Sequence, residues 1–166
     1  DLPKLLRRDS RTLAAVVARC CEIKAEVVGQ DETESGLRAI LNFGHTVGHA
    51  IEAVSGYGHY LHGEAISIGM VYAAELAHAA GILDAVTLSR HREVLASVGL
   101  PTAYDGGDWT ALLAAMRRDK KSRGDLLRFV VLEGIARPVR LEGPSDELLR
   151  AAAAAVGVSG GQPTSR

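Results

Sequence analysis

The stretch LNFGHTVGHAIE (residues 41–52), followed by LHGE (61–64), carries the densest group of reactive side chains in the sequence. His45 and His49 are four residues apart, so on a helix they project from one face, one turn apart. His62 follows a glycine-rich turn that can return it over the same face. Three imidazoles and nearby glutamates among small residues predict a metal site or a site for a polar substrate.

The same residues also have a plainer interpretation. Two histidines at helical spacing are more often a partly exposed polar face than a metal site, and Gly44 and Gly48 can serve close helix packing with no ligand. Adding His62 and a carboxylate brings the group to the three protein ligands that a catalytic zinc site needs. The spacing alone leaves both interpretations open.

The periodicity of apolar residues predicts a mainly α fold. Helices are expected over 10–29, 37–41, 46–54, 63–80, 84–97, 109–120 and 145–155. The helix over 63–80 is the most apolar, so we expect it in the core. Two short β-rich runs, 126–132 and 138–141, predict a small β-hairpin near 126–141 that turns around Glu133 and Gly134.

Length and composition indicate one globular domain. The chain has 166 residues, 47% hydrophobic and 23% charged, so we expect a domain over 1–156 and a disordered tail over 157–166. A net charge of −1 argues against a nucleic-acid partner, and no apolar run approaches a membrane span or a signal peptide. Adjacent Cys20 and Cys21 cannot easily bridge each other, so we expect buried helix residues in a reducing cytoplasm.

Four motifs follow one another along the chain, and a known family has them in this order. They are CEIKAEVV with DETESGLR (21–28 and 31–38), NFGHTVGHAIE (42–52), LHGEA (61–65) and RDKK (118–121). Over residues from about 20 to about 140 the chain resembles 3-dehydroquinate synthase. The resemblance is to the multi-helix C-terminal domain of that fold. It implies that the family's N-terminal NAD-binding domain lies outside this chain.

The resemblance implies a metal centre that spacing alone does not give. Its ligands in this chain are His45 and His62, and the third is a glutamate upstream of this chain. This replaces the pair of His45 and His49 that helical spacing suggests. The metal is Zn²⁺ or Co²⁺, between which ligand type does not decide. His49 corresponds to a catalytic histidine that lies near the substrate phosphate and helps proton transfer.

The resemblance also implies substrate contacts on several segments. The implied substrate-binding residues are Lys24, Arg38, Asn42, His49, Lys120 and Lys121. Lys24 and Arg38 correspond to residues around the substrate carboxylate, and Lys24 is also placed among the catalytic residues. Asn42 corresponds to a phosphate-side contact.

Three further assignments complete the implied site. Glu34 corresponds to a catalytic acid near the substrate. One of Lys120 and Lys121 binds phosphate, with a slight preference for Lys120. The remaining histidines match no motif position and are expected to be surface or packing residues: His59, His78 and His91.

The implied activity is that of a carbon–oxygen lyase of the shikimate pathway, which serves aromatic amino acid biosynthesis. Such an enzyme converts 3-deoxy-D-arabino-heptulosonate 7-phosphate to 3-dehydroquinate, releases phosphate and regenerates its NAD⁺ within each turnover. We expect this chain alone to be inactive and to bind metal weakly. In the full enzyme a homodimer in the cytoplasm is expected.

Two other functions remain open at this point. Related sugar-phosphate cyclases make cyclitols from substrates without a carboxylate, whereas aminodehydroquinate synthases use a similar carboxylated one; Arg38 and Lys24 favour a carboxylated substrate. Alternatively, the chain is a non-catalytic helical interaction module with a partner on the apolar face of helix 63–80. Whether His45 and His62 approach each other distinguishes these possibilities.

Overall fold

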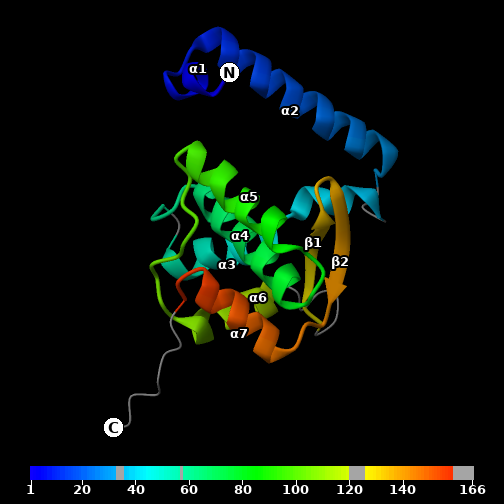
Figure 1. Cartoon of the computed structure of the whole chain (residues 1–166), viewed down its shortest axis with the longest axis vertical. Helices are drawn as coiled ribbons and strands as arrows, with labels where there is room; N and C mark the ends of the chain where they lie inside the picture. Colours follow the sequence, from blue (N-terminus) through cyan, green and yellow to red (C-terminus); the bar gives the residue numbers. More distant parts are fainter. Residues whose placement is uncertain (33–35, 57, 120–125, 159–166) are drawn as a thin grey trace. The chain divides into compact units, whose positions relative to one another are not determined.

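The computed structural model describes residues 1–32, 36–56, 58–119 and 126–158, and the mainly helical class is confirmed. The chain divides into two compact units, one before and one after the bond between Asn42 and Phe43, and Figure 1 shows the elements of each. The single domain expected over 1–156 stays a prediction, since compact units are not in themselves separate domains. No helix in the described ranges is long and apolar enough to cross a membrane.

The first unit contains α1 (Leu2–Leu6), α2 (Ser10–Gln30) and the 3₁₀ helix η1 (Leu37–Asn42). The helix α2 begins after Asp9, whose carboxylate accepts hydrogen bonds from the backbone N–H and the hydroxyl of Thr12 at 2.9 and 2.6 Å. The helix predicted over 10–29 is confirmed. The segment predicted over 37–41 is helical but of the tighter 3₁₀ type, and α1 was not predicted.

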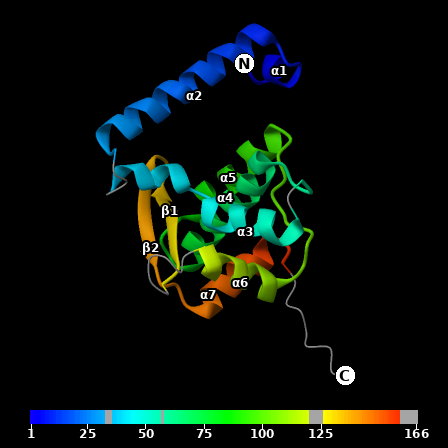
Figure 2. The same cartoon turned by 180° about the vertical axis from the view of Figure 1, so that it is seen from behind.

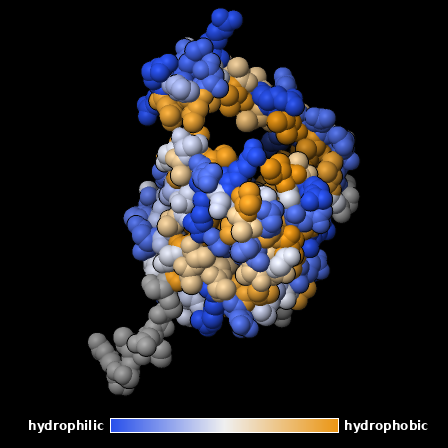
Figure 3. Space-filling view, in the orientation of Figure 1, coloured by the Kyte–Doolittle hydropathy of each residue, from blue (hydrophilic) through white to orange (hydrophobic). Residues whose placement is uncertain are grey.

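The apolar stripe of α2 is exposed. None of its residues is buried, and Leu13, Val16, Val17 and Ile23 are between 38% and 59% exposed. Apolar side chains are visible along this helix in Figure 3. Cys20 and Cys21 are exposed as well, so their predicted burial is wrong, because α2 has no buried face to hold them.

The second unit is built around α4 (His62–Ala79) (Figures 1 and 2). It packs against α3 (His45–Ser55), α5 (Ala85–Ser97), α7 (Asp146–Ala155) and the strand β1, while α6 (Trp109–Asp119) packs on α3. Most of α4 is buried, which confirms its predicted place in the core. An interaction module that used this apolar face is therefore excluded, because the chain covers the face itself.

The hairpin consists of β1 (Arg128–Gly134) and β2 (Arg137–Glu142), paired antiparallel. Its turn lies at Ile135 and Ala136, two residues later than predicted, and Ala136 adopts a positive φ of 58°. A register irregularity between Leu132 and Gly134 adds one unpaired residue to β1 just before the turn. Alternate residues of β1 face the core.

The core extends two residues beyond the predicted domain boundary. Val158 is 4% exposed, and its N–H donates to the carbonyl of Ala153 at 2.9 Å. The tail predicted from 157 therefore starts too early, because an apolar residue follows the turn after α7. The rest of that tail, 159–166, lies outside the described residues.

Glycines bring the backbones of α3 and α4 into contact. Gly44 precedes α3 with a φ of 79°, and a Cβ there would lie 2.7 Å from the backbone nitrogen of Met70. A Cβ on Gly48 would lie 2.6 Å from Cδ1 of Ile66, and one on Gly69 would collide with the Gly44 carbonyl oxygen. Gly44 and Gly48 therefore do serve close helix packing. This packing sets the position of the start of α3 relative to the start of α4.

We predict that Gly69→Ala destabilises the protein by about 1–3 kcal/mol, because the added methyl group meets rigid backbone rather than a movable side chain. The free energy of unfolding is measured by urea denaturation. Gly63→Ala, on the same helix but with open space around the added atom, is the matched control and should retain or slightly raise stability. Equal stability of Gly69→Ala and wild type would contradict the tight contact.

Candidate metal centre

Three imidazoles converge where α3 and α4 begin. His45 is the first residue of α3, His49 lies one turn later, and His62 is the first residue of α4. The ring centroids are 5.3 Å apart for His45 and His49, 5.7 Å for His45 and His62, and 5.9 Å for His49 and His62. The predicted approach of His45 to His62 is therefore present.

Hydrogen bonds orient two of the three rings. Nδ1 of His45 donates to the carbonyl oxygen of Phe43 at 3.1 Å, and Nδ1 of His62 lies 3.0 Å from Oε1 of Glu52. Because both partners are acceptors, Nδ1 carries the hydrogen in each ring and the lone pair of the neutral imidazole is on Nε2. Within the described parts of the chain, His49 has no hydrogen-bond partner. Two rings are thus held with one nitrogen free for a ligand.

The electrostatic environment favours neutral His45. Partial burial lowers its pKa from the ordinary 6.5; the neighbouring His49 and His62 lower it further, and the bond to Phe43 and the charge of Glu52 act in the opposite direction. The neutral ring is the form that binds metal ions, because protonation would occupy the lone pair. His45 is therefore favoured in the form whose lone pair can bind a cation.

A capping glutamate positions His62. The carboxylate of Glu64 accepts the backbone N–H of Leu61 at 2.8 Å, which satisfies a free donor before the first turn of α4. Since His62 is the first residue of that turn, the cap fixes the backbone that carries its imidazole. The sequence motifs assign Glu64 no role, although its spacing of three from Leu61 is a signal for such a cap.

A carboxylate joins the histidine cluster. Ligand atoms of His49, Glu52 and His62 all lie within 4.8 Å of one another, which forms a second possible triad beside the pair of His45 and His62. Glu52 was not assigned a role from the sequence. It lies three residues after His49 and seven after His45, and this helical spacing is the signal that could have placed it on the same face.

The remaining implied substrate residues lie in the first unit or outside the described chain. Lys24 is on α2 and exposed, and Arg38 and Asn42 are on η1. These three residues belong to the first unit, whereas the three histidines belong to the second. The predicted residues Glu34, Lys120 and Lys121 lie outside the described residues.

Asp31 hydrogen-bonds to the backbone at Gly36 and Arg38. Its buried carboxylate accepts the backbone N–H groups of these residues at 2.8 and 2.9 Å, and Nη1 of Arg38 donates to the carbonyl of Glu32 at 2.9 Å. These bonds join the end of α2 to the start of η1. The role of Asp31 was not predicted, because it depends on a fold-back over seven residues.

The other histidines have the packing or surface positions expected of them. Nδ1 of His78 lies 2.8 Å from the carbonyl oxygen of Leu83, in the connection after α4, and Nδ1 of His91 lies 2.7 Å from that of Thr87, one turn earlier in α5. His59 is exposed, with Nε2 4.0 Å from a carboxylate oxygen of Asp105. None of the three joins the cluster.

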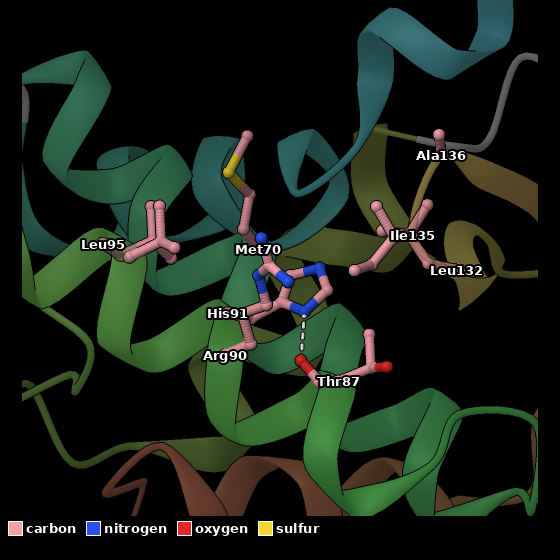
Figure 4. A pocket seen from close by; sticks show the side chains of 9 residues that line it. Met70, Thr87, Arg90, His91, Leu95, Leu132, Ile135 and Ala136 are labelled. Carbon is pink, nitrogen blue, oxygen red and sulfur yellow. Dashed lines mark hydrogen bonds between the residues drawn. The ribbon is translucent and has the colours of Figure 1, made fainter.

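A separate cavity of about 270 Å³ lies between α4, α5 and the hairpin turn (Figure 4). Its walls are mainly apolar, and Arg90, His91 and Thr87 supply its polar atoms. The hydroxyl of Thr87 is already bonded to Asp84, which caps α5. The cavity shares no residue with the histidine cluster and holds no group of paired acids, bases or nucleophiles.

Comparison with known proteins assigns the family. A family model described as "3-dehydroquinate synthase C-terminal" matches residues 1–122. The 3-dehydroquinate synthases of Corynebacterium jeikeium and Streptomyces avermitilis are 56% and 55% identical over 144 residues, 87% of this chain. The chain belongs to the 3-dehydroquinate synthase family. It spans only 39% of the length of these relatives.

Solved structures show the same fold. A 2-epi-5-epi-valiolone synthase from Streptomyces hygroscopicus subsp. jinggangensis, with NAD⁺ and Zn²⁺ bound, has a TM-score of 0.75 and 25% identity over 86% of this chain and 39% of its own. A 2-deoxy-scyllo-inosose synthase complexed with carbaglucose-6-phosphate, NAD⁺ and Co²⁺ has the same score and identity, over 87% and 41%.

We predict that the imidazole of His45 titrates below 6.5 in the metal-free protein, because burial disfavours its charged form. Its contribution to stability is present above the unfolded pKa of about 6.5 and is lost as the pH falls through the lower folded value. NMR titration of histidine-labelled protein measures the pKa directly. In His45→Asn, the unfolding free energy should fall less than in wild type on acidification; a His45 pKa above 6.5 would contradict the account.

Proposed function

We propose that this chain is the metal- and substrate-binding part of a 3-dehydroquinate synthase. The completed enzyme converts 3-deoxy-D-arabino-heptulosonate 7-phosphate to 3-dehydroquinate and releases phosphate, with NAD⁺ used and regenerated in each turnover. The observation that carries the proposal is the convergence of three imidazoles, two of them oriented through Nδ1. Relatives at 52–56% identity with this enzyme's name support the substrate class.

The metal ligands in this proposal are His45 and His62, with a glutamate from the upstream part of the enzyme as the third. Ligating histidines typically donate their second ring nitrogen to a carbonyl or carboxylate, as these two do. His49 has no such anchor among the described residues. We therefore prefer this pair to the triad of His49, Glu52 and His62. The chemistry of two imidazoles and a carboxylate suits Zn²⁺ or Co²⁺.

Each group then has a distinct task. A divalent ion bound here would polarise a substrate hydroxyl or carbonyl oxygen. His49, exposed and beside the two ligands, is available to take or return a proton at its ring nitrogens. Lys24 and Arg38 would hold the substrate carboxylate, Arg38 through two parallel hydrogen bonds.

The phosphate end of the substrate would be held by other residues. Asn42 contributes a neutral contact, Lys120 or Lys121 a point charge, and Glu34 the acid near the reacting ring. Several cations around a dianion keep it fixed while charge develops at the reacting carbon. These assignments come from motif positions, and the activity of the completed enzyme tests them together.

The partner of the chain would be the NAD-binding part of the same enzyme. Both solved relatives described above contain NAD⁺, and each is more than twice as long as the region that this chain matches. The uncovered apolar stripe of α2, with Leu13, Val16, Val17 and Ile23, is suited to burial against further protein. We propose that the completed enzyme forms a homodimer in the cytoplasm.

Cyclitol synthases are the second candidate, since the two solved relatives carry such names. Their identity to this chain is 25%, whereas that of the 3-dehydroquinate synthases is above 50%. Arg38 and Lys24 also supply partners for a carboxylate, which a cyclitol precursor lacks. The choice therefore falls on the carboxylated substrate.

We predict that this chain joined to its upstream NAD-binding part releases phosphate from 3-deoxy-D-arabino-heptulosonate 7-phosphate, and that a chelator stops the reaction. The chain alone should show no turnover. A seven-carbon sugar phosphate without the carboxylate should react at least about 100-fold more slowly, because a charged contact is lost. Preference for that compound would favour a cyclitol synthase, and turnover by the chain alone would contradict the proposal.

We predict that His45→Ala and His62→Ala each abolish phosphate release and weaken Co²⁺ binding, because each removes one metal ligand. His59→Ala, at an exposed position outside the cluster, is the matched control and should behave as wild type. Co²⁺ binding is followed by its visible absorption. Unchanged Co²⁺ binding in both ligand variants would reject the proposed ligand pair.

A further inference from the structure

We propose that Glu52 is a positioning residue for the metal centre: its carboxylate fixes Nδ1 of His62 and so aims Nε2 of that ring at the bound ion. This inference rests on the proposed function. It assigns a role to a residue that lies outside the implied set of metal ligands, substrate contacts and catalytic groups. The motif supplied the glutamate, but only the fold shows what it contacts.

The contact joins two helices across ten residues of sequence. Oε1 of Glu52, in the third turn of α3, lies 3.0 Å from Nδ1 of His62, at the start of α4. The side chain of Glu52 is 16% exposed, whereas that of His62 is 59% exposed. The less mobile partner is therefore the carboxylate, which is set in the protein surface and anchors a ring that projects into solvent.

His62 needs such an anchor more than His45 does. The ring of His45 is held by the carbonyl of Phe43, a backbone group two residues away. His62, at the exposed first position of α4, has Glu52 as its hydrogen-bond partner among the described residues. Without that contact the ring can rotate and exchange tautomers, and a metal ion would have to order it on binding.

The charge of Glu52 also favours a cation at the cluster. Ligand atoms of Glu52, His49 and His62 all lie within 4.8 Å of one another, so the carboxylate is close to more than one of the imidazoles. A carboxylate that accepts a hydrogen bond from a ligating imidazole makes the other ring nitrogen more basic. Glu52 therefore both orients His62 and strengthens its bond to the metal ion.

A direct ligand role for Glu52 fits the geometry less well. Oε1 of Glu52 is already engaged by Nδ1 of His62. If Glu52 bound the ion in the triad with His49 and His62, that hydrogen bond would have to break or be shared, and the orientation of His62 would be lost. The positioning role keeps the observed hydrogen bond and leaves Nε2 free.

The test compares three variants in the enzyme completed by its upstream part. Glu52→Ala removes the acceptor and the charge, Glu52→Gln keeps an acceptor oxygen without the charge, and Glu93→Gln removes a charge from an exposed site on α5 as the matched control. We expect Co²⁺ binding to weaken about 10- to 100-fold in Glu52→Ala, less in Glu52→Gln and not at all in Glu93→Gln. In a protein that already carries His62→Ala, Glu52→Ala should weaken Co²⁺ binding little further, since Glu52 acts through the ring of His62.

A second readout needs no metal. Nitrogen NMR of histidine-labelled, metal-free protein should find the Nδ1–H tautomer of His62 in wild type and Glu93→Gln, and a mixture of tautomers in Glu52→Ala. Unchanged Co²⁺ binding or an unchanged tautomer in Glu52→Ala would overturn the inference, as would a loss far beyond 100-fold, which indicates a direct ligand. If wild type binds no Co²⁺, the proposed metal site itself fails. If wild type binds Co²⁺ and the Glu52 variants bind it equally well, the site stands and this inference alone fails.

Discussion

The backbone contact between α3 and α4 at Gly44, Gly48 and Gly69 is the constraint on which the site depends. Since no side chain separates the helices there, their starting residues are set by the main chain rather than by adjustable packing. His45 and His62 are those starting residues. A methyl group at the contact would separate the helices and with them the two imidazoles. The glycines of the motif therefore serve the histidines through geometry, without touching a ligand.

Hydrogen bonds refine what the helix contact places. A carbonyl holds His45, a carboxylate holds His62, and Glu64 holds the backbone from which His62 projects. The two partners of the rings are acceptors, so the lone pair of each imidazole stays on Nε2 and is available to a cation. The contact of Glu64 instead fixes the backbone at the start of α4. Partial burial then keeps His45 neutral, in the form that binds metal. Packing, hydrogen bonding and electrostatics thus favour the same state of the cluster.

The sequence was sufficient for most helices and for the approach of His45 to His62, whereas their role as metal ligands stays a prediction. Caps such as Asp9 and Asp84 mark helix starts, and the glycine-rich motif is specific enough to indicate which histidines converge. It was not sufficient for Glu52, since a contact across a loop depends on how two helices cross. The exposure of Cys20 and the division after Asn42 were missed because an apolar stripe in a sequence does not show what covers it.

The most direct test of the central claim is the coordination of the bound metal. X-ray absorption of the Zn²⁺-loaded, completed enzyme measures the number of imidazoles in the first shell. The account predicts two, with Zn–N distances of about 2.0–2.1 Å, unchanged in His49→Gln and reduced to one in His62→Gln. Loss of an imidazole in His49→Gln, or no imidazole in wild type, would contradict the assignment of His45 and His62 as the ligands of this chain.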